Sequence, residues 1–115
     1  MNGDLEKYRK DFTIVRETAA QVIKDFNVAG FEITFSANEL LAYEELKQQI
    51  EVVLSELFRN HLSKFQNLLY KIDIEERQLK KNLRDTDPSL YTSIIADLIL
   101  QREFNKVLTR RFYSK

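Results

Sequence analysis

Residues that interrupt helices are scarce in this chain. Its 115 residues include two glycines and one proline, namely Gly3, Gly30 and Pro88. Leucine, lysine, glutamate, glutamine and arginine, which all favour helix, are abundant. Because few breakers leave few places for turns, we predict an all-α fold. We expect a bundle of three long amphipathic helices, or four, in a single helical-bundle domain over residues 1–115.

Apolar residues recur in alternating steps of three and four near the start of the chain. This spacing is the a/d pattern of a coiled coil, and it predicts a helix from about Asp4 to Asn27 with one packing seam. Gly30 should end the helix, because glycine readily adopts the left-handed conformation common at helix C-termini. The seam positions are Leu5, Tyr8, Phe12, Val15, Ala19, Val22 and Phe26.

The segment 31–36 alternates apolar and polar side chains, with Phe31, Ile33 and Phe35 on one side. A period of two is typical of a strand, but a lone strand leaves backbone groups unpaired and needs a partner. Tyr70–Ile74, which also alternates, is one candidate, and the same segment of a second chain is another. We favour a short extended connector whose phenylalanines cover the end of the bundle.

A second helix is predicted to follow Ser36-Ala37-Asn38-Glu39, which has the Ser-x-x-Glu form of a capping box. Apolar residues at helical spacing continue from there to Ile72, and neither glycine nor proline occurs before Pro88. If it ran unbroken from Ala37 to Arg84, this helix would measure about 70 Å at 1.5 Å per residue.

We favour a break near Ile72, because a helix of that length would extend far beyond its neighbours. Asp73 would then be the N-cap of a short helix over residues 74–85, with acidic residues in its first turn. Leu79 and Leu83 would face the core of the bundle.

Asp87-Pro88 is the clearest boundary in the sequence, because Asp is a favoured N-cap and proline suits the first helical position. The last helix should run from Pro88 to about Phe112. Six apolar residues at core spacing are expected to be buried: Val15, Val22, Leu46, Leu57, Ile95 and Leu98.

The residue types that catalytic and metal sites recruit are few. The chain has no cysteine, which excludes disulfides and thiolate metal sites, and it has no glycine-rich phosphate loop. His61, the one histidine, stands one turn after Leu57, so we interpret it as a packing residue at the core edge. We therefore expect no catalytic residue, no cofactor and no metal ion, and we predict that the protein is not an enzyme.

The densest acidic cluster is formed by Asp73, Glu75 and Glu76. Asp73 precedes Arg77 by four residues, and Glu76 precedes Lys80 by the same distance. Opposite charges at this spacing are neighbours on a helix surface, so we interpret them as solvated ion pairs.

The formal charges balance, with 18 Lys and Arg against 18 Asp and Glu, so no general attraction to nucleic acid or to an anionic membrane is expected. The exception is a basic run near the C-terminus. Cations suit the negative end of a helix dipole, which is one explanation, and contact with nucleic acid or an acidic partner is the other. The candidate contact residues are Arg102, Lys106, Arg110 and Arg111.

Taken together, these patterns predict a non-enzymatic helical interaction protein. It would bind another protein or associate with itself, a homodimer being slightly favoured, through its apolar helix faces. The alternative is a nucleic-acid-associated accessory subunit that uses the C-terminal basic run. No small-molecule substrate is inferred.

The start of the chain mixes acids and bases without an apolar run, so no signal peptide is expected. No stretch approaches the roughly 18 consecutive apolar residues of a membrane span. We therefore expect a soluble, cytoplasmic protein that does not associate with membranes.

Overall fold

The computed structural model describes residues 11–38 and 41–113, and these residues form helices and connecting segments without any strand. The all-α prediction is confirmed. The helices are α2 (Phe12–Val28), α3 (Ala42–Asn60), α4 (Leu62–Ile72), α5 (Glu76–Leu83) and α6 (Tyr91–Tyr113), with a 3₁₀ turn η2 (Pro88–Leu90) leading into α6. The described part of the chain therefore has more helices than the three or four expected, because α3 and α4 are separate helices.

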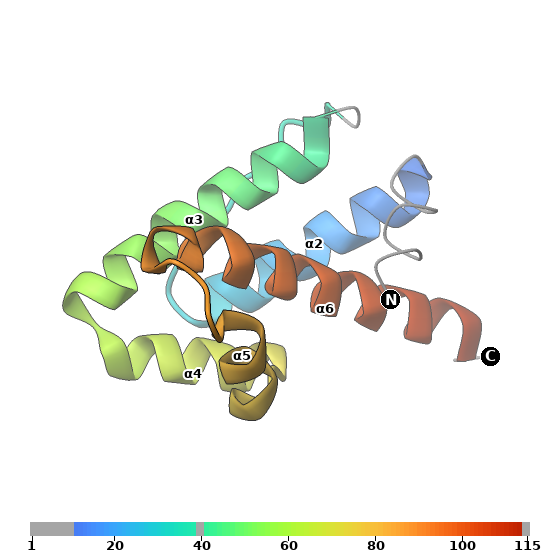
Figure 1. Ribbon diagram of the computed structural model, residues 1–115. Helices are drawn as coiled ribbons and strands as arrows, with labels where there is room; N and C mark the ends of the chain where they lie inside the picture. Colours follow the sequence, from blue (N-terminus) through green and yellow to red (C-terminus); the bar gives the residue numbers. More distant parts are fainter. Residues whose placement is uncertain (1–10, 39–40, 114–115) are drawn as a thin grey trace.

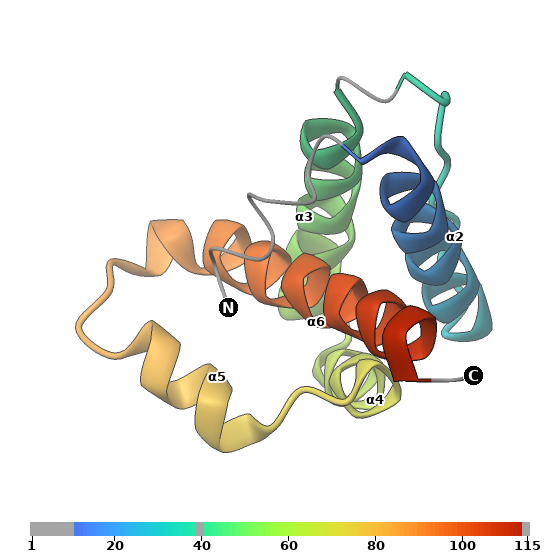
Figure 2. The ribbon, with the colours of Figure 1, turned by 90° about the vertical axis from the view of Figure 1, so that its right-hand side faces the viewer.

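Helix α6 is the centre of the bundle. It contacts α2, α3, α4, α5 and η2. Figures 1 and 2 show α2 and α3 on one side of it and α4 and α5 on the other. Its residues Ile95, Ala96, Leu98, Ile99 and Leu100 are all buried. Such closely spaced buried positions cover most of the helix circumference, which is typical of a helix surrounded by others.

Helix α2 begins where the Asp11 carboxylate accepts hydrogen bonds from the backbone N–H groups of Thr13 (3.1 Å) and Ile14 (3.3 Å). It ends before Gly30, whose φ of 94° is the left-handed conformation that the sequence predicts. Glycine takes this conformation without the steric penalty of a Cβ atom. The predicted N-terminal part of this helix, before residue 11, lies outside the described residues.

The predicted seam of this helix is only partly correct. Its C-terminal half, Ala19, Val22 and Phe26, is buried, but Phe12 is 42% exposed and Val15 is only partly buried. The helix packs against α6 as well as against α3 and α4, so its buried stripe is wider than one heptad seam. Five of the six predicted core residues are buried, and the prediction is wrong for Val15.

The segment 31–36 forms neither a helix nor a strand, which supports the connector interpretation, and it does not pair with Tyr70–Ile74. Pairing with a second chain stays a prediction. Ile33 is buried, and Phe31 and Phe35 pack partly buried against the main core. The Gln49 side chain of α3 replaces a strand partner: its Oε1 accepts from the Thr34 N–H (2.9 Å), and its Nε2 donates to the Thr34 carbonyl (2.7 Å). One amide side chain thus satisfies both polar groups of that backbone unit.

The capping-box prediction is not confirmed. Helix α3 begins at Ala42, after the N-cap residue Leu41, which caps no backbone group with its side chain. Ser36 instead accepts a hydrogen bond from the N–H of Asn38 within the connector (3.3 Å). Glu39, the other half of the predicted box, lies outside the described residues.

The predicted long helix is interrupted twice. One break, at His61, was not predicted; there the backbone leaves helical geometry at φ −146° and ψ 63°. The other follows Ile72 and confirms the expected break, but Asp73 is not the N-cap of the next helix. It is the left-handed residue that ends α4, with φ 71° and ψ 50°.

The end of α4 is a Schellman motif. The Ile74 N–H donates to the Leu69 carbonyl (2.9 Å), and the Asp73 N–H donates to the Tyr70 carbonyl (3.1 Å). Ile74 and Leu69 are both buried, as the hydrophobic contact of this motif requires. Helix α5 therefore starts at Glu76 rather than at residue 74, and its Leu79 and Leu83 face the core as predicted.

The boundary at Asp87-Pro88 is confirmed. The Asp87 carboxylate accepts from the Ser89 N–H (2.9 Å), and Pro88 is the first residue of η2. Helix α6 is also fastened to α3 by its Asp97, which accepts from the Tyr43 hydroxyl and forms an ion pair with Lys47 at 3.1 Å.

Candidate functional site

Two of the predicted C-terminal contact residues bind other helices of the same chain through charged partners. A nitrogen of Arg102 lies 2.7 Å from the Asp73 carboxylate, and its Nε donates to the Asp73 carbonyl (3.2 Å). Arg111 lies 2.6 Å from Glu17 on α2. The first contact holds the left-handed residue after α4 against α6, and the second holds the N-terminal half of α2.

The other two predicted residues, Lys106 and Arg110, belong to one network. Lys106 Nζ donates to Asp25 Oδ2 on α2 (3.0 Å). Arg110 donates to Gln21 Oε1 (2.9 Å), and Gln21 in turn donates to Asp25 Oδ1 (3.1 Å). All four basic residues therefore have hydrogen-bond partners within the chain, and three of them, Arg102, Lys106 and Arg111, pair with acids.

Glu103, which sequence analysis did not single out, is the most unusual member of this network. Its side chain is 0% exposed, and Lys106 Nζ lies 2.9 Å from its Oε1. Within the described part of the structure, neither carboxyl oxygen makes a hydrogen bond of good geometry. Burial raises the pKa of Glu103 to about 8, and the nearby Asp25 carboxylate acts in the same direction.

The pKa of Asp25 is shifted in the opposite direction. Burial tends to raise its pKa, but polar contacts with Glu103, Lys106 and Gln21 outweigh this effect and hold the pKa below the usual 3.8. The favoured state therefore has Asp25 ionised, Glu103 protonated and Lys106 charged, so the buried cluster carries no net charge. The Glu103 side chain has no exposed surface, and its polar neighbours include Lys106 of the same helix and Asp25 of α2.

His61 is fully outside the core, contrary to the prediction. It is exposed and stands at the break between α3 and α4, where helical geometry stops. The seam spacing from Leu57 placed it inward only on the assumption of a continuous helix.

The two predicted ion pairs have different outcomes. Lys80 lies 3.5 Å from Glu76, as predicted, with both side chains 76% exposed, so the pair contributes little to stability. Asp73 pairs with Arg102 rather than with Arg77. It could not pair along a helix, because it ends α4 and lies outside α5.

Charge is segregated along the chain although the total is zero. Residues 11–58 contain nine Asp or Glu and three Lys or Arg, a net charge of −6, whereas residues 59–84 contain three and seven, a net charge of +4. The first stretch includes α2 and all but the last two residues of α3, and the second includes α4 and α5. The two pairs of helices lie on opposite sides of α6 (Figures 1 and 2). Counting charge by segment would have revealed this asymmetry from sequence.

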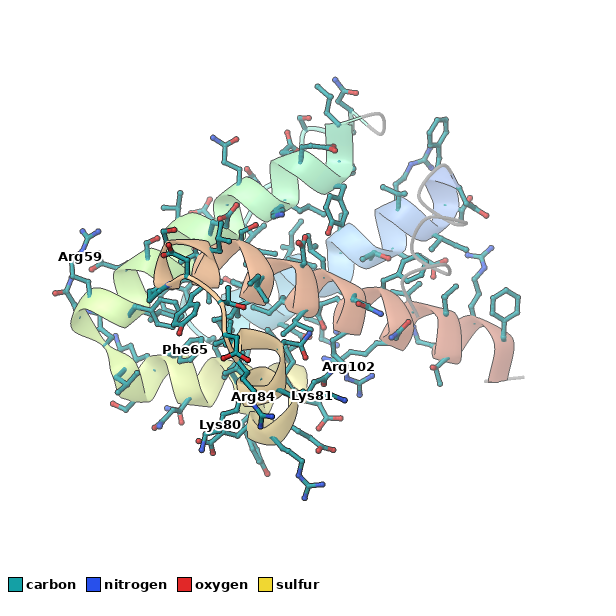
Figure 3. All side chains as sticks on the ribbon, in the orientation of Figure 1. Arg59, Phe65, Lys80, Lys81, Arg84 and Arg102 are labelled. Carbon is teal, nitrogen blue, oxygen red and sulfur yellow. The ribbon has the colours of Figure 1, made fainter. Side chains whose placement is uncertain are left out.

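The bases of α5 form a strip on its outer face, opposite the buried Leu79 and the half-buried Leu83. Figure 3 shows Lys80 and Lys81 on this helix and Arg84 directly after its end. Lys80 has Glu76 as a partner. By contrast, Arg77, Lys81 and Arg84 form no ion pair with any described residue, and all three are exposed.

A groove of about 480 Å³ lies where α4 ends and α5 begins. Its lining includes Gln66, Leu69, Tyr70, Ile74, Glu75 and Arg77. Tyr70 is 88% exposed, the largest exposed fraction among the exposed large hydrophobic residues described. Leu62, which is 61% exposed, shares one face of α4 with Gln66 and Tyr70 because the three are spaced four residues apart.

Other kinds of site find less support in the described ranges. Among these residues, no three His, Asp or Glu side chains gather in a way that could hold a metal ion. No described helix has both the length and the apolar composition needed to cross a membrane. Comparison of the chain with protein-family models, curated proteins and solved structures finds no match.

Proposed function

We propose that this chain is a non-enzymatic protein-binding domain and that a partner protein docks on its α4–α5 face. We define this face by Leu62, Gln66 and Tyr70 of α4, together with Ile74 and Arg77 beside the groove. The exposure of Tyr70 at the edge of a groove is the observation that carries the proposal. Tyrosine combines a large apolar ring with a polar end, and it is enriched among the residues that dominate protein interfaces.

The arrangement of the exposed apolar residues supports this surface over others. Single exposed hydrophobic residues are ordinary on protein surfaces and need no function. Val52 on α3 is one such residue, since Gln48 and Glu56 flank it on the same face. Leu62 and Tyr70 differ, because they share a face of α4 that borders a groove, and the apolar part of the groove lining includes Leu69 and Ile74.

Self-association through the seam of the first helix has weaker support than the sequence suggested. Ala19, Val22 and Phe26 are buried inside the chain, so this half of the seam is unavailable to a second copy. The nucleic-acid alternative relied on Arg102, Lys106, Arg110 and Arg111. Three of these pair with acids of the chain, and Arg110 donates to the Gln21 amide. We therefore favour a different protein as the partner.

Photo-crosslinking tests the proposal directly. Tyr70 would be replaced with the photoreactive amino acid benzoylphenylalanine, and Gln48, an exposed residue of α3, would be replaced in a matched control. In the native cell extract we expect a discrete crosslinked protein from position 70 and none from position 48. Excess unlabelled wild-type chain should abolish the crosslink, whereas excess Leu62→Ser/Tyr70→Ser chain should not. Competition by the double variant as strong as that of the wild type would refute docking on this face.

A further inference from the structure

The unpaired cations of α5 form a surface that repels itself. Arg77 and Lys81 are four residues apart on α5, and Arg84, the residue that directly follows the helix, is three positions after Lys81, so like charges are neighbours. Like charges at these spacings destabilise a helix. The described bases of α6 have acidic or amide partners, whereas these three residues have none within the ranges 11–38 and 41–113. An acidic partner would remove this repulsion.

The cationic strip and the groove between α4 and α5 are parts of one surface. Arg77 belongs to both, since it lines the groove together with Tyr70 and Ile74 and stands on the outer face of α5 with Lys81 and Arg84. A ligand seated in the groove therefore reaches the cations without crossing another element.

The groove itself disfavours nucleic acid. Asp73, Glu75 and Glu76 also line it, so phosphate groups placed there would face carboxylates. A protein segment avoids this conflict. Its apolar side chains can occupy the groove, while its acidic side chains lie outside the groove and contact the cations of α5.

A second copy of this chain is also disfavoured. Its acid-rich α2–α3 side could meet the basic α4–α5 side, since these lie on opposite sides of α6 (Figures 1 and 2). Such a head-to-tail contact joins two different surfaces, and it closes into a dimer only if a twofold axis relates them.

From this juxtaposition we infer the chemistry of the partner: it presents an acidic amphipathic segment. An apolar side chain of that segment enters the groove beside Tyr70 and Ile74, and its carboxylates meet Arg77, Lys81 and Arg84. This inference rests on the proposed function, because it specifies what binds on the same face.

Three synthetic peptides of equal length, titrated into the ¹⁵N-labelled full chain, test the inference by NMR. The first peptide forms an amphipathic helix with Leu and Phe on one face and Glu on the other. The second has Lys in place of Glu, and the third keeps Glu but has Ser in place of Leu and Phe. We expect the first peptide to shift the backbone amides of residues 66–84 and to bind at least tenfold more tightly than the other two. Its affinity should fall as salt is added.

Two charge variants locate the effect. Arg77→Gln/Lys81→Gln/Arg84→Gln should weaken binding of the first peptide at least tenfold. Lys24→Gln/Arg59→Gln/Lys64→Gln removes the same number of exposed charges that have no ion-pair partner among the described residues, and it should bind like the wild type. Thermal melting of both variants checks that each is folded.

The contrary outcomes are distinguishable. Tighter binding of the Lys peptide to the same amides would overturn the acidic chemistry while leaving the α4–α5 face as the docking site. Shifts confined to other residues, or none from any peptide, would overturn the inference, and the crosslink at position 70 would still decide the proposed function. Oligothymidine would be titrated in the same way. If it changed the chemical shifts of the α5 amides more than the Glu peptide does, and in a salt-sensitive manner, the strip would be assigned to nucleic acid. Concentration-dependent sedimentation that the triple variant at α5 abolishes would assign it to a second copy.

Discussion

Lys106 Nζ lies 2.9 Å from the Oε1 of Glu103, a carboxyl group with no exposed surface. The same nitrogen lies 3.0 Å from Asp25, so one cation serves two buried acids. One proton must therefore remain on the pair if the cluster is to be neutral. This arrangement fastens α6 to α2 and makes the stability of the fold sensitive to pH.

We expect the free energy of unfolding to decrease between about pH 4.5 and about pH 8, because the pKa of Glu103 is raised from 4.5 to about 8 in the folded chain. Over that interval the folded state keeps a proton that the unfolded state releases, so rising pH favours unfolding. The slope for one proton is at most about 1.4 kcal/mol per pH unit. Urea unfolding at several pH values measures it.

Glu103→Gln should remove most of this slope, because the amide is neutral at every pH. Glu75→Gln, an exposed control, should retain it. Asp25 acts at lower pH: its pKa is below 3.8, so its stabilisation is complete above that value and is lost as the pH falls through the folded pKa. Equal slopes in the wild type and in Glu103→Gln would show that Glu103 is not the group responsible.

Lys106→Met should destabilise the fold by about 3 kcal/mol, because it leaves the Asp25 carboxylate buried without its cation. The triple variant Asp25→Asn/Glu103→Gln/Lys106→Met should recover part of this loss, since no buried charge remains. Chemical denaturation of both variants provides the comparison. If the triple variant is the less stable of the two, hydrogen bonding within the cluster, and not charge compensation, is its main contribution.

Leu57→Ala should cost about 2–5 kcal/mol, because it leaves a cavity at a fully buried position of α3. Val52→Ala, on the exposed face of the same helix, should change stability by no more than about 0.5 kcal/mol. Thermal melts of the two variants should differ clearly. Similar melting temperatures would mean that the core-facing side of α3 is assigned incorrectly.

Gly30→Ala should cost about 1–2 kcal/mol, because φ at this position is 94° and a Cβ atom is unfavourable there. No heavy atom lies within 4 Å of where the Cβ would stand, so the cost is conformational and not steric packing. Gly30→Asn should lose less stability, since asparagine tolerates the left-handed region better. A neutral Gly30→Ala variant would indicate that the connector adopts another conformation in solution.

Some of this architecture follows from local sequence alone. Asp87-Pro88 starts the last helix, Gly30 follows the first, and Leu79 and Leu83 face the core, all as predicted. These outcomes depend on contacts between residues a few positions apart: a cap, a left-handed backbone and helical periodicity. Such interactions are the same wherever the segment is placed in the fold, so a sequence pattern is enough to predict them.

The candidate surfaces, in contrast, were decided by tertiary structure. Arg102 and Arg111 stood out in the sequence, but their partners, Asp73 and Glu17, are 29 and 94 residues away. Arg77 was assigned to Asp73 and is left without an ion pair among the described residues, because the left-handed turn at Asp73 directs that acid to α6. Long-range pairing redistributes which charges are satisfied and which face water, and it depends on helix placement that no local pattern encodes.

Position in the bundle likewise decided the burial of individual side chains. The spacing of apolar residues placed Val15 in the core and did not include the polar Glu103, yet Val15 is only partly buried and Glu103 is fully buried. Periodicity determines which residues share a helix face, and this the sequence settled by itself. How many neighbouring helices cover each face depends on how the helices pack together. The burial of these side chains therefore follows from the central position of α6 and from the packing of α2 against it.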